Sequence, residues 1–94
     1  MKARFSERSI RNLTSIWDHI SKDSPDAASR VVCTIVEAAL RLERFPLSGR
    51  VGRVAGTREL VVPGLPYIIP YRVVEDAILI PSIIHTSRKW PKTL

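Results

Sequence analysis

The chain has 94 residues, of which 45% are hydrophobic and 26% charged, a length and composition that fit one small globular domain over residues 1–94. Its net charge of +6 is uneven, because residues 44–94 carry eight Lys or Arg against three Asp or Glu, which favours an anionic partner or a basic surface kept for solubility. The apolar runs are too short to span a membrane, no secretion leader is visible and the lone Cys33 can form neither an internal disulfide nor a zinc site, so we expect a cytoplasmic protein without metal or cofactor.

The first half of the chain predicts a short strand and two helices. Residues 2–5 alternate polar and apolar side chains, as a strand does. Ser6 can cap a helix of about four turns. The apolar face of that helix is formed by Ile10, Leu13, Ile16, Trp17 and Ile20. Ser24-Pro25-Asp26 marks the start of a second helix, which we expect to end near Arg44. The short link between them predicts an antiparallel hairpin.

The second half predicts a glycine-rich loop and three strands. Residues 47–56 hold three of the four glycines, two arginines and no acid, and their spacing matches neither a phosphate-binding loop nor a dinucleotide fingerprint. This loop either folds over a ligand or only connects its neighbours. Apolar runs predict strands at 57–62, 67–74 and 77–84, with Glu75-Asp76 as the turn between the last two.

Pro70 and Pro81 lie inside these predicted strands, where proline cannot donate to a ladder. A two-residue turn would place the two prolines opposite each other. It would also put Arg72 and His85 on one face, with Tyr67 and Tyr71 on the other. A bulge is the alternative, and a shift of one residue would separate Arg72 from His85.

The predicted order is therefore strand, helix, helix, strand, strand, strand. A helical hairpin packed on one face of a small, mainly antiparallel sheet would bury both apolar helix stripes, which gives a two-layer α+β domain. Because no helix remains for the other face of the sheet, we expect that face to be partly open.

Cationic side chains on and after the predicted strands could form a site for phosphate. Guanidinium groups match phosphate as planar, permanently charged donors, and a histidine can transfer protons near neutral pH. The candidates are Arg58, Arg72, His85 and Arg88. Such a set could catalyse attack of a ribose 2′-hydroxyl on the adjacent phosphate. Glu59 is the one nearby carboxylate that could act as base, but on a regular strand it points away from Arg58. Structural salt bridges and a structural His85 are the competing interpretations, and we expect His19 to be solvated on the first helix.

Several segments follow a known pattern in order and with its spacing. They are Ser24-Pro25-Asp26-Ala27-Ala28, Phe45-Pro46, Gly49-Arg50, residues 56–62, Tyr71-Arg72-Val73 and His85-Thr86-Ser87-Arg88-Lys89-Trp90-Pro91. Together they resemble the RelE/ParE superfamily of toxins from bacterial type II toxin–antitoxin modules. The segment from His85 to Pro91 is similar to the ParE branch, whereas Pro70 and Pro81 depart from the usual apolar strand residues.

The resemblance implies the fold predicted above and a small antitoxin that wraps and neutralises the toxin, in a heterotetramer or a larger even-numbered assembly. ParE-like members poison DNA gyrase and are not known as nucleases, so our first hypothesis is a gyrase inhibitor without catalysis of its own. The alternative is a RelE-like, ribosome-dependent mRNA endonuclease. Its working residues would be Arg58, Arg72, His85 and Glu59. A toxin fold that only binds its antitoxin is a third hypothesis.

Two sets of contacts are expected from this resemblance. The target would be bound by Arg58, Arg72, His85, Arg88, Lys89 and Trp90. An antitoxin helix would lie across the helical hairpin, and the antitoxin tail would reach the basic strands. The residues expected to bind the antitoxin are Leu13, Trp17, Val36, Leu40, Arg58 and Arg72.

Overall fold

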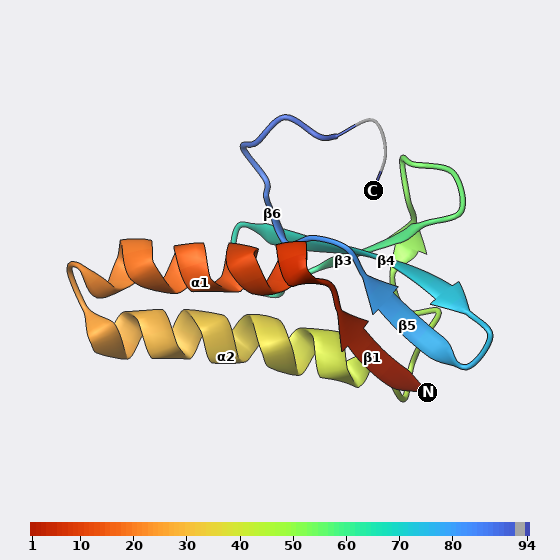
Figure 1. Ribbon diagram of the computed structural model, residues 1–94, viewed down its shortest axis with the longest axis horizontal. Coiled ribbons are helices and arrows are strands. Elements are labelled where there is room, and N and C mark those ends of the chain that lie inside the picture. The colour runs from red at the N-terminus through yellow and green to blue at the C-terminus, as the bar shows by residue number, and fades with distance from the viewer. Residues whose placement is uncertain (92–93) are drawn as a thin grey trace.

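The computed structural model describes residues 1–91 and 94. Along the chain the elements are β1 (Lys2–Phe5), α1 (Glu7–Ser21), α2 (Pro25–Arg41), β2 (Arg50–Val51), β3 (Arg58–Val61), β4 (Tyr67–Val74), β5 (Ala77–Ile80) and β6 (Ile84–His85). The strands form one sheet in the order β1-β5-β4-β3-β2, and β6 pairs with β4 (Figure 1). β1 runs parallel to β5, and the other strand pairs are antiparallel.

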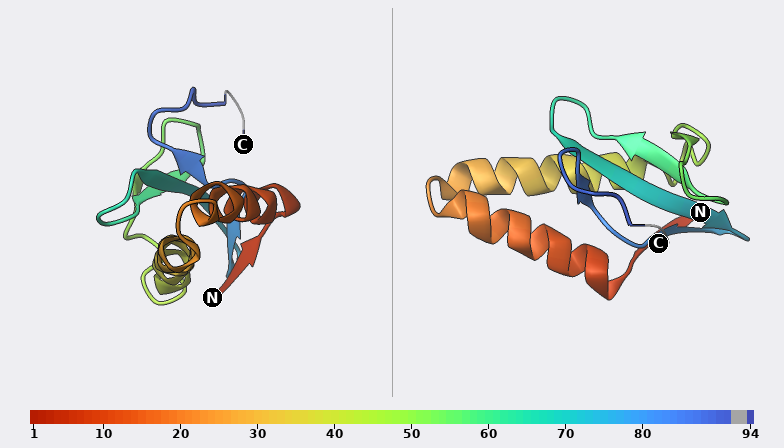
Figure 2. Two further views of the ribbon diagram at one scale, coloured as in Figure 1. Left: turned by 90° about the vertical axis from the view of Figure 1, so that its left-hand side faces the viewer. Right: turned by 90° about the horizontal axis from the view of Figure 1, so that it is seen from above.

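Both helices begin at a serine cap. Ser6 Oγ accepts a hydrogen bond from the Ser9 N–H at 3.0 Å, and Ser24 Oγ accepts one from the Ala27 N–H at 3.1 Å. The two helices form a hairpin on one face of the sheet (Figure 2), which confirms the predicted two-layer α+β fold. Neither helix is long and apolar enough to cross a bilayer, as far as residues 1–91 and 94 show.

The second helix is shorter than the sequence predicts. It ends at Arg41, and the expected end was near Arg44. The last turn tightens, because the amides of residues 42–44 each donate to a carbonyl three residues earlier. This tight turn leads the chain directly into Phe45-Pro46.

The core lies between α2 and the inner face of the sheet, by which we mean the face that carries Tyr71. Its fully buried members include Ile35, Ala38 and Ala39 of α2, Leu42 directly after α2, and Ile69, Tyr71 and Ile78 of the sheet. The Tyr71 hydroxyl donates to the Pro46 carbonyl at 2.8 Å and accepts from the Gly49 N–H at 2.9 Å. Tyr71 thereby fixes the start of the loop after α2 against the sheet.

The predicted loop over residues 47–56 contains a strand that the sequence did not indicate. Arg50 and Val51 pair with Glu59 and Arg58 as β2. The Gly52 N–H donates to the Thr57 carbonyl at 2.8 Å and closes this hairpin. The β2–β3 pairing brings the arginines of the loop close to Glu59.

The predicted strand 77–84 is two strands with a register break between them. From the turn, Val74 pairs with Ala77 and Arg72 with Leu79, which is the predicted register. The chain leaves the ladder at Pro81 and returns as β6, where His85 pairs with Tyr67. The β5–β6 side therefore contains one more residue than the facing part of β4, as in a bulge.

The break changes the face that His85 occupies. Because directly paired residues share a face, His85 lies on the side of Tyr67, opposite to Arg72. The prediction that Arg72 and His85 share a face is wrong. Its physical reason is Asn12 of α1, whose Oδ1 accepts hydrogen bonds from the Ser82 hydroxyl and the Ile83 N–H, both at 3.0 Å, and so supplies the partner that the ladder lacks there.

Candidate functional site

Glu59 is the most strongly bound carboxylate among the described residues. Its side chain is 2% exposed on the outer face of β3, next to Pro70. Arg53 donates its backbone N–H and Nε to Oε2 at 2.8 and 3.1 Å, and its Nη2 to Oε1 at 3.2 Å. Arg50 donates Nε and Nη2 to Oε1 at 3.3 and 3.1 Å. The carboxylate is thus shared between two guanidinium groups.

These hydrogen bonds decide the protonation of Glu59. Burial alone would raise the pKa of its carboxyl group, but the hydrogen bonds from the Arg53 side chain and backbone and from Arg50 outweigh it, so the pKa lies below its ordinary value. A carboxylate with low proton affinity and all these donors is poorly suited to take a proton from a substrate hydroxyl. Its geometry is that of an anchor for the β2–β3 loop.

Arg58 lies on the opposite face of the same strand, where its guanidinium group is hydrogen-bonded to the backbone. It pairs with Tyr71, so its side chain projects from the inner face of the sheet. Glu59 projects from the outer face, as the sequence predicts. Its Nη1 donates to the Gly49 carbonyl at 2.8 Å and, more weakly, to the Leu47 carbonyl at 3.4 Å. Arg58 therefore closes the loop that follows α2.

Arg72 lies on the outer face and has a different neighbour, Arg4. Both are paired with Leu79, one from β4 and one from β1. Arg72 Nη1 donates to the Ala55 carbonyl at 3.2 Å. An open cavity of about 330 Å³ lies beside them, lined by Arg4, Phe5, Ser6, Arg72, Leu79, Ile80, Pro81 and Leu94. Two arginines thus flank a mostly apolar floor.

His85 and Arg88 lie in a cleft between α1 and β6. The His85 ring meets Tyr67 edge-on, with ring centroids 5.2 Å apart and planes at 86°. Burial raises the pKa of the Tyr67 hydroxyl, while the charge of Arg88 acts in the opposite direction. The cleft measures about 190 Å³ and is lined by Asn12, Ser15, Ile16, His19, Tyr67, Ile83, His85 and Arg88.

The C-terminal tail, residues 86–91, rises from β6 (Figure 1). The Arg53 guanidinium carbon lies 3.9 Å from the centre of the Trp90 ring, a cation–π contact. The Trp90 Nε1 is buried and has no hydrogen-bond partner among the described residues. Arg88 and Lys89 of the tail are exposed.

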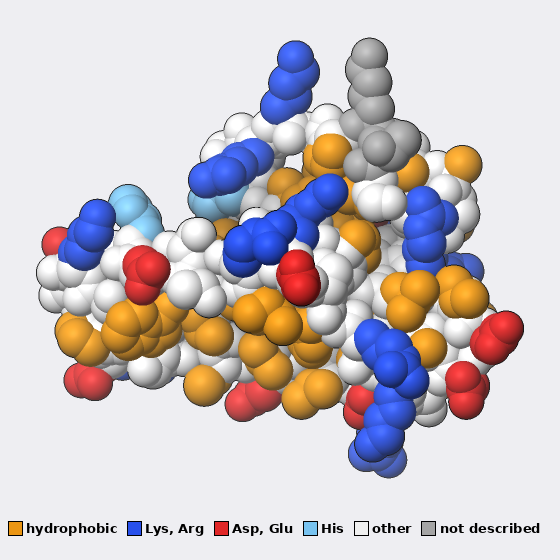
Figure 3. All heavy atoms as spheres, in the orientation of Figure 1, with side chains coloured by type: hydrophobic (Ala, Val, Ile, Leu, Met, Phe, Trp, Pro, Cys, Tyr) orange, Lys and Arg blue, Asp and Glu red, His pale blue; other side chains and the backbone are white. Residues whose placement is uncertain are grey.

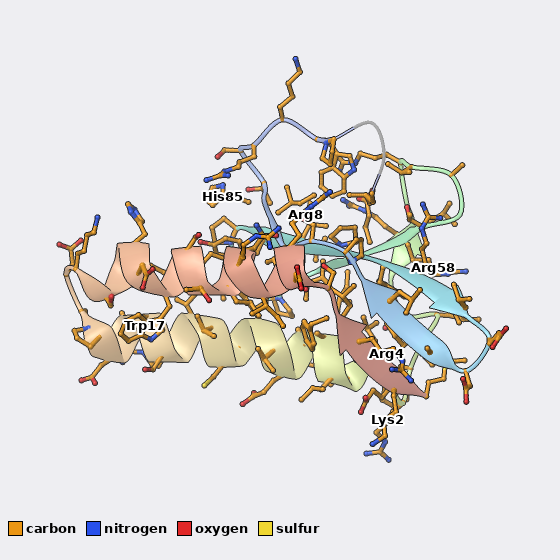
Figure 4. All side chains as sticks on the ribbon, viewed as in Figure 1. Lys2, Arg4, Arg8, Trp17, Arg58 and His85 are labelled. Atoms are coloured by element: carbon orange, nitrogen blue, oxygen red, sulfur yellow. The ribbon has the colours of Figure 1, made fainter. Side chains whose placement is uncertain are left out.

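The structure therefore divides the cationic set that the sequence suggested. Arg58 belongs to the loop after α2, Arg72 to the cavity with Arg4, and His85 to the cleft beside α1. Figure 4 shows His85 and Arg58 well apart from each other. The described histidines, cysteine and acids also form no group of three that could hold a metal ion.

The outer surface of the helical hairpin is an apolar groove. Ile10 and Trp17 of α1 are 53% and 40% exposed, and Leu40 of α2 is 44% exposed. A cavity of about 310 Å³ runs between the helices, lined by Ile10, Leu13, Thr14, Trp17 and Val32. Val36 and Leu40 follow Val32 at intervals of four residues and extend its stripe along α2. Figure 3 shows apolar side chains along both helices.

Sequence reasoning missed several members of these sites. Arg53 lay in a segment read as a loop, and no local signal pairs it with Glu59. A signal for the cleft did exist, because Asn12, Ser15 and His19 recur at helical spacing and form a polar stripe on α1. Arg4 could have been found from the alternation of β1, which turns it outward.

Comparison with known proteins gives consistent relatives. A family model described as "ParE toxin of type II toxin-antitoxin system, parDE" matches residues 3–90. Over 93 residues the chain is 44% identical to a candidate toxin named Y4kP from Sinorhizobium fredii, with 99% of this chain and 96% of the relative covered. Over 81 residues it is 40% identical to the toxin RelE2 of Caulobacter vibrioides, with 86% and 90% covered.

A solved structure of similar fold comes from the same type of toxin–antitoxin system. It is described as the chromosomal ParDE TA system from P. aeruginosa, and one of its chains superposes with a TM-score of 0.84 at 28% sequence identity. The match covers 93% of this chain and 97% of that chain.

Proposed function

Because the chain belongs to the ParE toxin family of type II toxin–antitoxin systems, we propose that it arrests growth by binding DNA gyrase in the cytoplasm and that a cognate antitoxin neutralises it. The similarity to a chain of a ParDE toxin–antitoxin structure supports the antitoxin partner. In this proposal the protein is an inhibitor and performs no catalysis of its own.

The observation that carries this proposal is the state of Glu59 and its neighbours. A ribonuclease of the kind considered above needs a base, an acid and phosphate-binding groups around one reacting atom. Glu59 is buried and shared by two arginines, while Arg58 and Arg72 leave opposite faces of the sheet. This distribution favours a binding surface over an active site.

A second candidate remains a ribosome-dependent mRNA endonuclease. The observation in its favour is the 40% identity to a relative named RelE2. In that case Arg72 of β4 and His85 of β6 would have to act from opposite faces of the sheet.

For the target we propose the basic tail together with the nearest strand positions. Arg88 and Lys89 are exposed and would make the first contacts with an acidic partner surface. Trp90 would present the tail from its position on Arg53. The other predicted target contacts, Arg58, Arg72 and His85, lie in three separate places and would add separate contacts around the tail.

For the antitoxin we propose the groove between α1 and α2. An amphipathic helix inserts apolar residues into such a groove at intervals of three and four residues. Leu13, Trp17 and the stripe of Val36 and Leu40 would contact it. A following acidic segment would cover Arg58 and Arg72, and two toxins would assemble with two antitoxins into a heterotetramer or a larger even-numbered complex.

The test is a supercoiling assay with purified gyrase and the full-length toxin. We expect inhibition that the double variant Arg88→Gln/Lys89→Gln weakens at least tenfold. A matched control is Lys22→Gln/Arg41→Gln, which removes the same charge from the exposed helical hairpin and should inhibit normally. Normal supercoiling at saturating toxin contradicts the proposal. Cleavage of mRNA in a translating extract would establish the second candidate instead.

A further inference from the structure

The cleft between α1 and β6 holds both histidines of the chain. His19 contributes from the last turn of α1, and His85 contributes from β6, 66 positions later in the sequence. Tyr67 forms the floor edge-on to His85, and Arg88 forms the rim at the start of the tail. Figure 3 shows Lys, Arg and His side chains above α1 and along the tail.

The cleft is lined by hydrogen-bond donors. The His85 Nδ1 accepts the Ser87 N–H at 3.1 Å and lies 2.7 Å from the Ser87 hydroxyl, so the proton of the neutral ring is on Nε2, which can donate. Asn12 uses its Oδ1 for the Ser82 and Ile83 contacts, and this orientation leaves its amide nitrogen as a donor. The Tyr67 and Ser15 hydroxyls add two more.

No negatively charged acceptor lines the cleft in the part of the chain that the structure describes. Four arginines of the sheet and its loops have oxygen partners: Arg50 and Arg53 share Glu59, and Arg58 and Arg72 donate to backbone carbonyls. The Arg88 side chain has no such partner among the described residues, and no Asp or Glu of those residues lines the cleft. A cationic, donor-rich cavity without an acid is complementary to a ligand with several acceptor oxygens.

We propose that the cleft formed by His19, Tyr67, His85 and Arg88 binds a phosphate group. A volume of about 190 Å³ accommodates a phosphate with part of its ester substituent. Tyr67 and His85 would donate from the floor, Arg88 from the rim and His19 from α1, so the oxygens are bound from three sides. The phosphate belongs to a nucleic-acid backbone or to a free nucleotide, two sources of the same chemistry. The site shares His85 and Arg88 with the proposed target surface, but phosphate binding by the isolated chain can be measured without any target.

The two histidines make the site directly observable. Their imidazole signals in the NMR spectrum of the full-length chain report on this cleft, and His19→Gln assigns them. We expect inorganic phosphate to shift both sets of signals saturably. Thymidine monophosphate and a single-stranded oligothymidylate then distinguish the sources. Tighter binding of the oligonucleotide assigns a nucleic acid, and equal or tighter binding of the monophosphate assigns a free nucleotide.

Variants separate the cleft from the general charge of the tail. Arg88→Gln and Tyr67→Phe each remove one donor and should weaken phosphate binding about tenfold. Lys89→Gln is the matched control, because it removes the same charge at the next position without lining the cleft, and its affinity should stay within about twofold of wild type. Amide spectra check that each variant is folded. Imidazole signals that do not respond to phosphate overturn the proposal, and so does a Lys89→Gln loss equal to that of Arg88→Gln.

Discussion

The guanidinium carbon of Arg53 lies 3.9 Å from the centre of the Trp90 ring. The same guanidinium binds the Glu59 carboxylate through Nε and Nη2. The tail is therefore connected to β3 through one arginine, which contacts an aromatic ring and a buried acid. This relationship explains how a segment without further strand pairing is positioned over the sheet.

The contact between Arg53 and Trp90 should be measurable in a double-mutant cycle. We expect Trp90→Ala and Arg53→Ala to couple by about 1 kcal/mol in the free energy of unfolding, a typical cation–π value. Proteolysis of the tail should be faster in both single variants, because each removes its attachment to β3. Additive single effects with an unchanged cleavage rate would show that the tail is held elsewhere.

Glu59→Gln should reduce stability in a pH-dependent way. The pKa of Glu59 is lowered in the folded protein, so its contribution is present above the unfolded value, near 4.5, and is lost as the pH falls through the folded value. At neutral pH we expect a loss of about 2 kcal/mol, less than for a fully buried pair because both arginines are about half exposed.

The effect is measured as the free energy of unfolding of the Glu59 variant and of wild type between about pH 3 and pH 7. This range of about four pH units includes the titration of carboxyl groups. The difference from wild type should shrink on acidification. Glu37→Gln is the control, since Glu37 is exposed on α2 and has no ion pair among the described residues. A difference that stays constant with pH would show that Glu59 acts through packing and not through its charge.

Gly49→Ala should destabilise the fold by sterics. A Cβ at this position would lie 2.7 Å from Cε1 and the hydroxyl of Tyr71 and 2.9 Å from the Glu59 carbonyl oxygen. Because the Tyr71 ring is fully buried it cannot move away freely, and we expect a loss of about 3 kcal/mol. Gly64→Ala is the comparison, as it has a positive φ of 76° but open space around it. Thermal unfolding of both should rank Gly49→Ala as the less stable variant.

Trp17→Glu should release the toxin from its antitoxin. A charge in the α1–α2 groove would be buried by a docked apolar helix, so we expect at least a hundredfold loss of affinity by calorimetry. Leu47→Glu is the matched control, since Leu47 is 65% exposed and lies outside the groove. Equal affinity of the two variants would place the antitoxin on another surface.

The helices and the order of the strands could be predicted because their signals are local. Ser6 and Ser24 cap helices within three residues, and the apolar spacing that follows is read directly from the sequence. The turn at Glu75-Asp76 likewise fixed the first pairs of β4 with β5. These elements depend on neighbours in the chain, which a single sequence contains.

The candidate sites could not be predicted to the same extent, because they depend on distant contacts. The bond from Ile83 to Asn12 joins residues 71 positions apart, and it accompanies the shift that moves His85 away from Arg72. Glu59 stands beside Arg58 in the sequence, yet it is bound by Arg50 and Arg53, which the pairing of β2 brings to it. The sequence suggested one cluster of cationic side chains on the strands. Because successive side chains alternate between the two faces of a sheet, Arg58 and Arg72 lie on opposite sides.

The extra residue between Ile80 and Ile84 determines the face of the sheet on which His85 lies. The number of backbone residues sets this face, and the chemistry of the side chain does not. A relative with the same ending but a straight ladder of equal length would turn that imidazole to the opposite side, next to the arginine of its own β4. The same sequence motif can thus lie on different surfaces in different family members. An aligned histidine at this position is therefore not enough to infer a shared function.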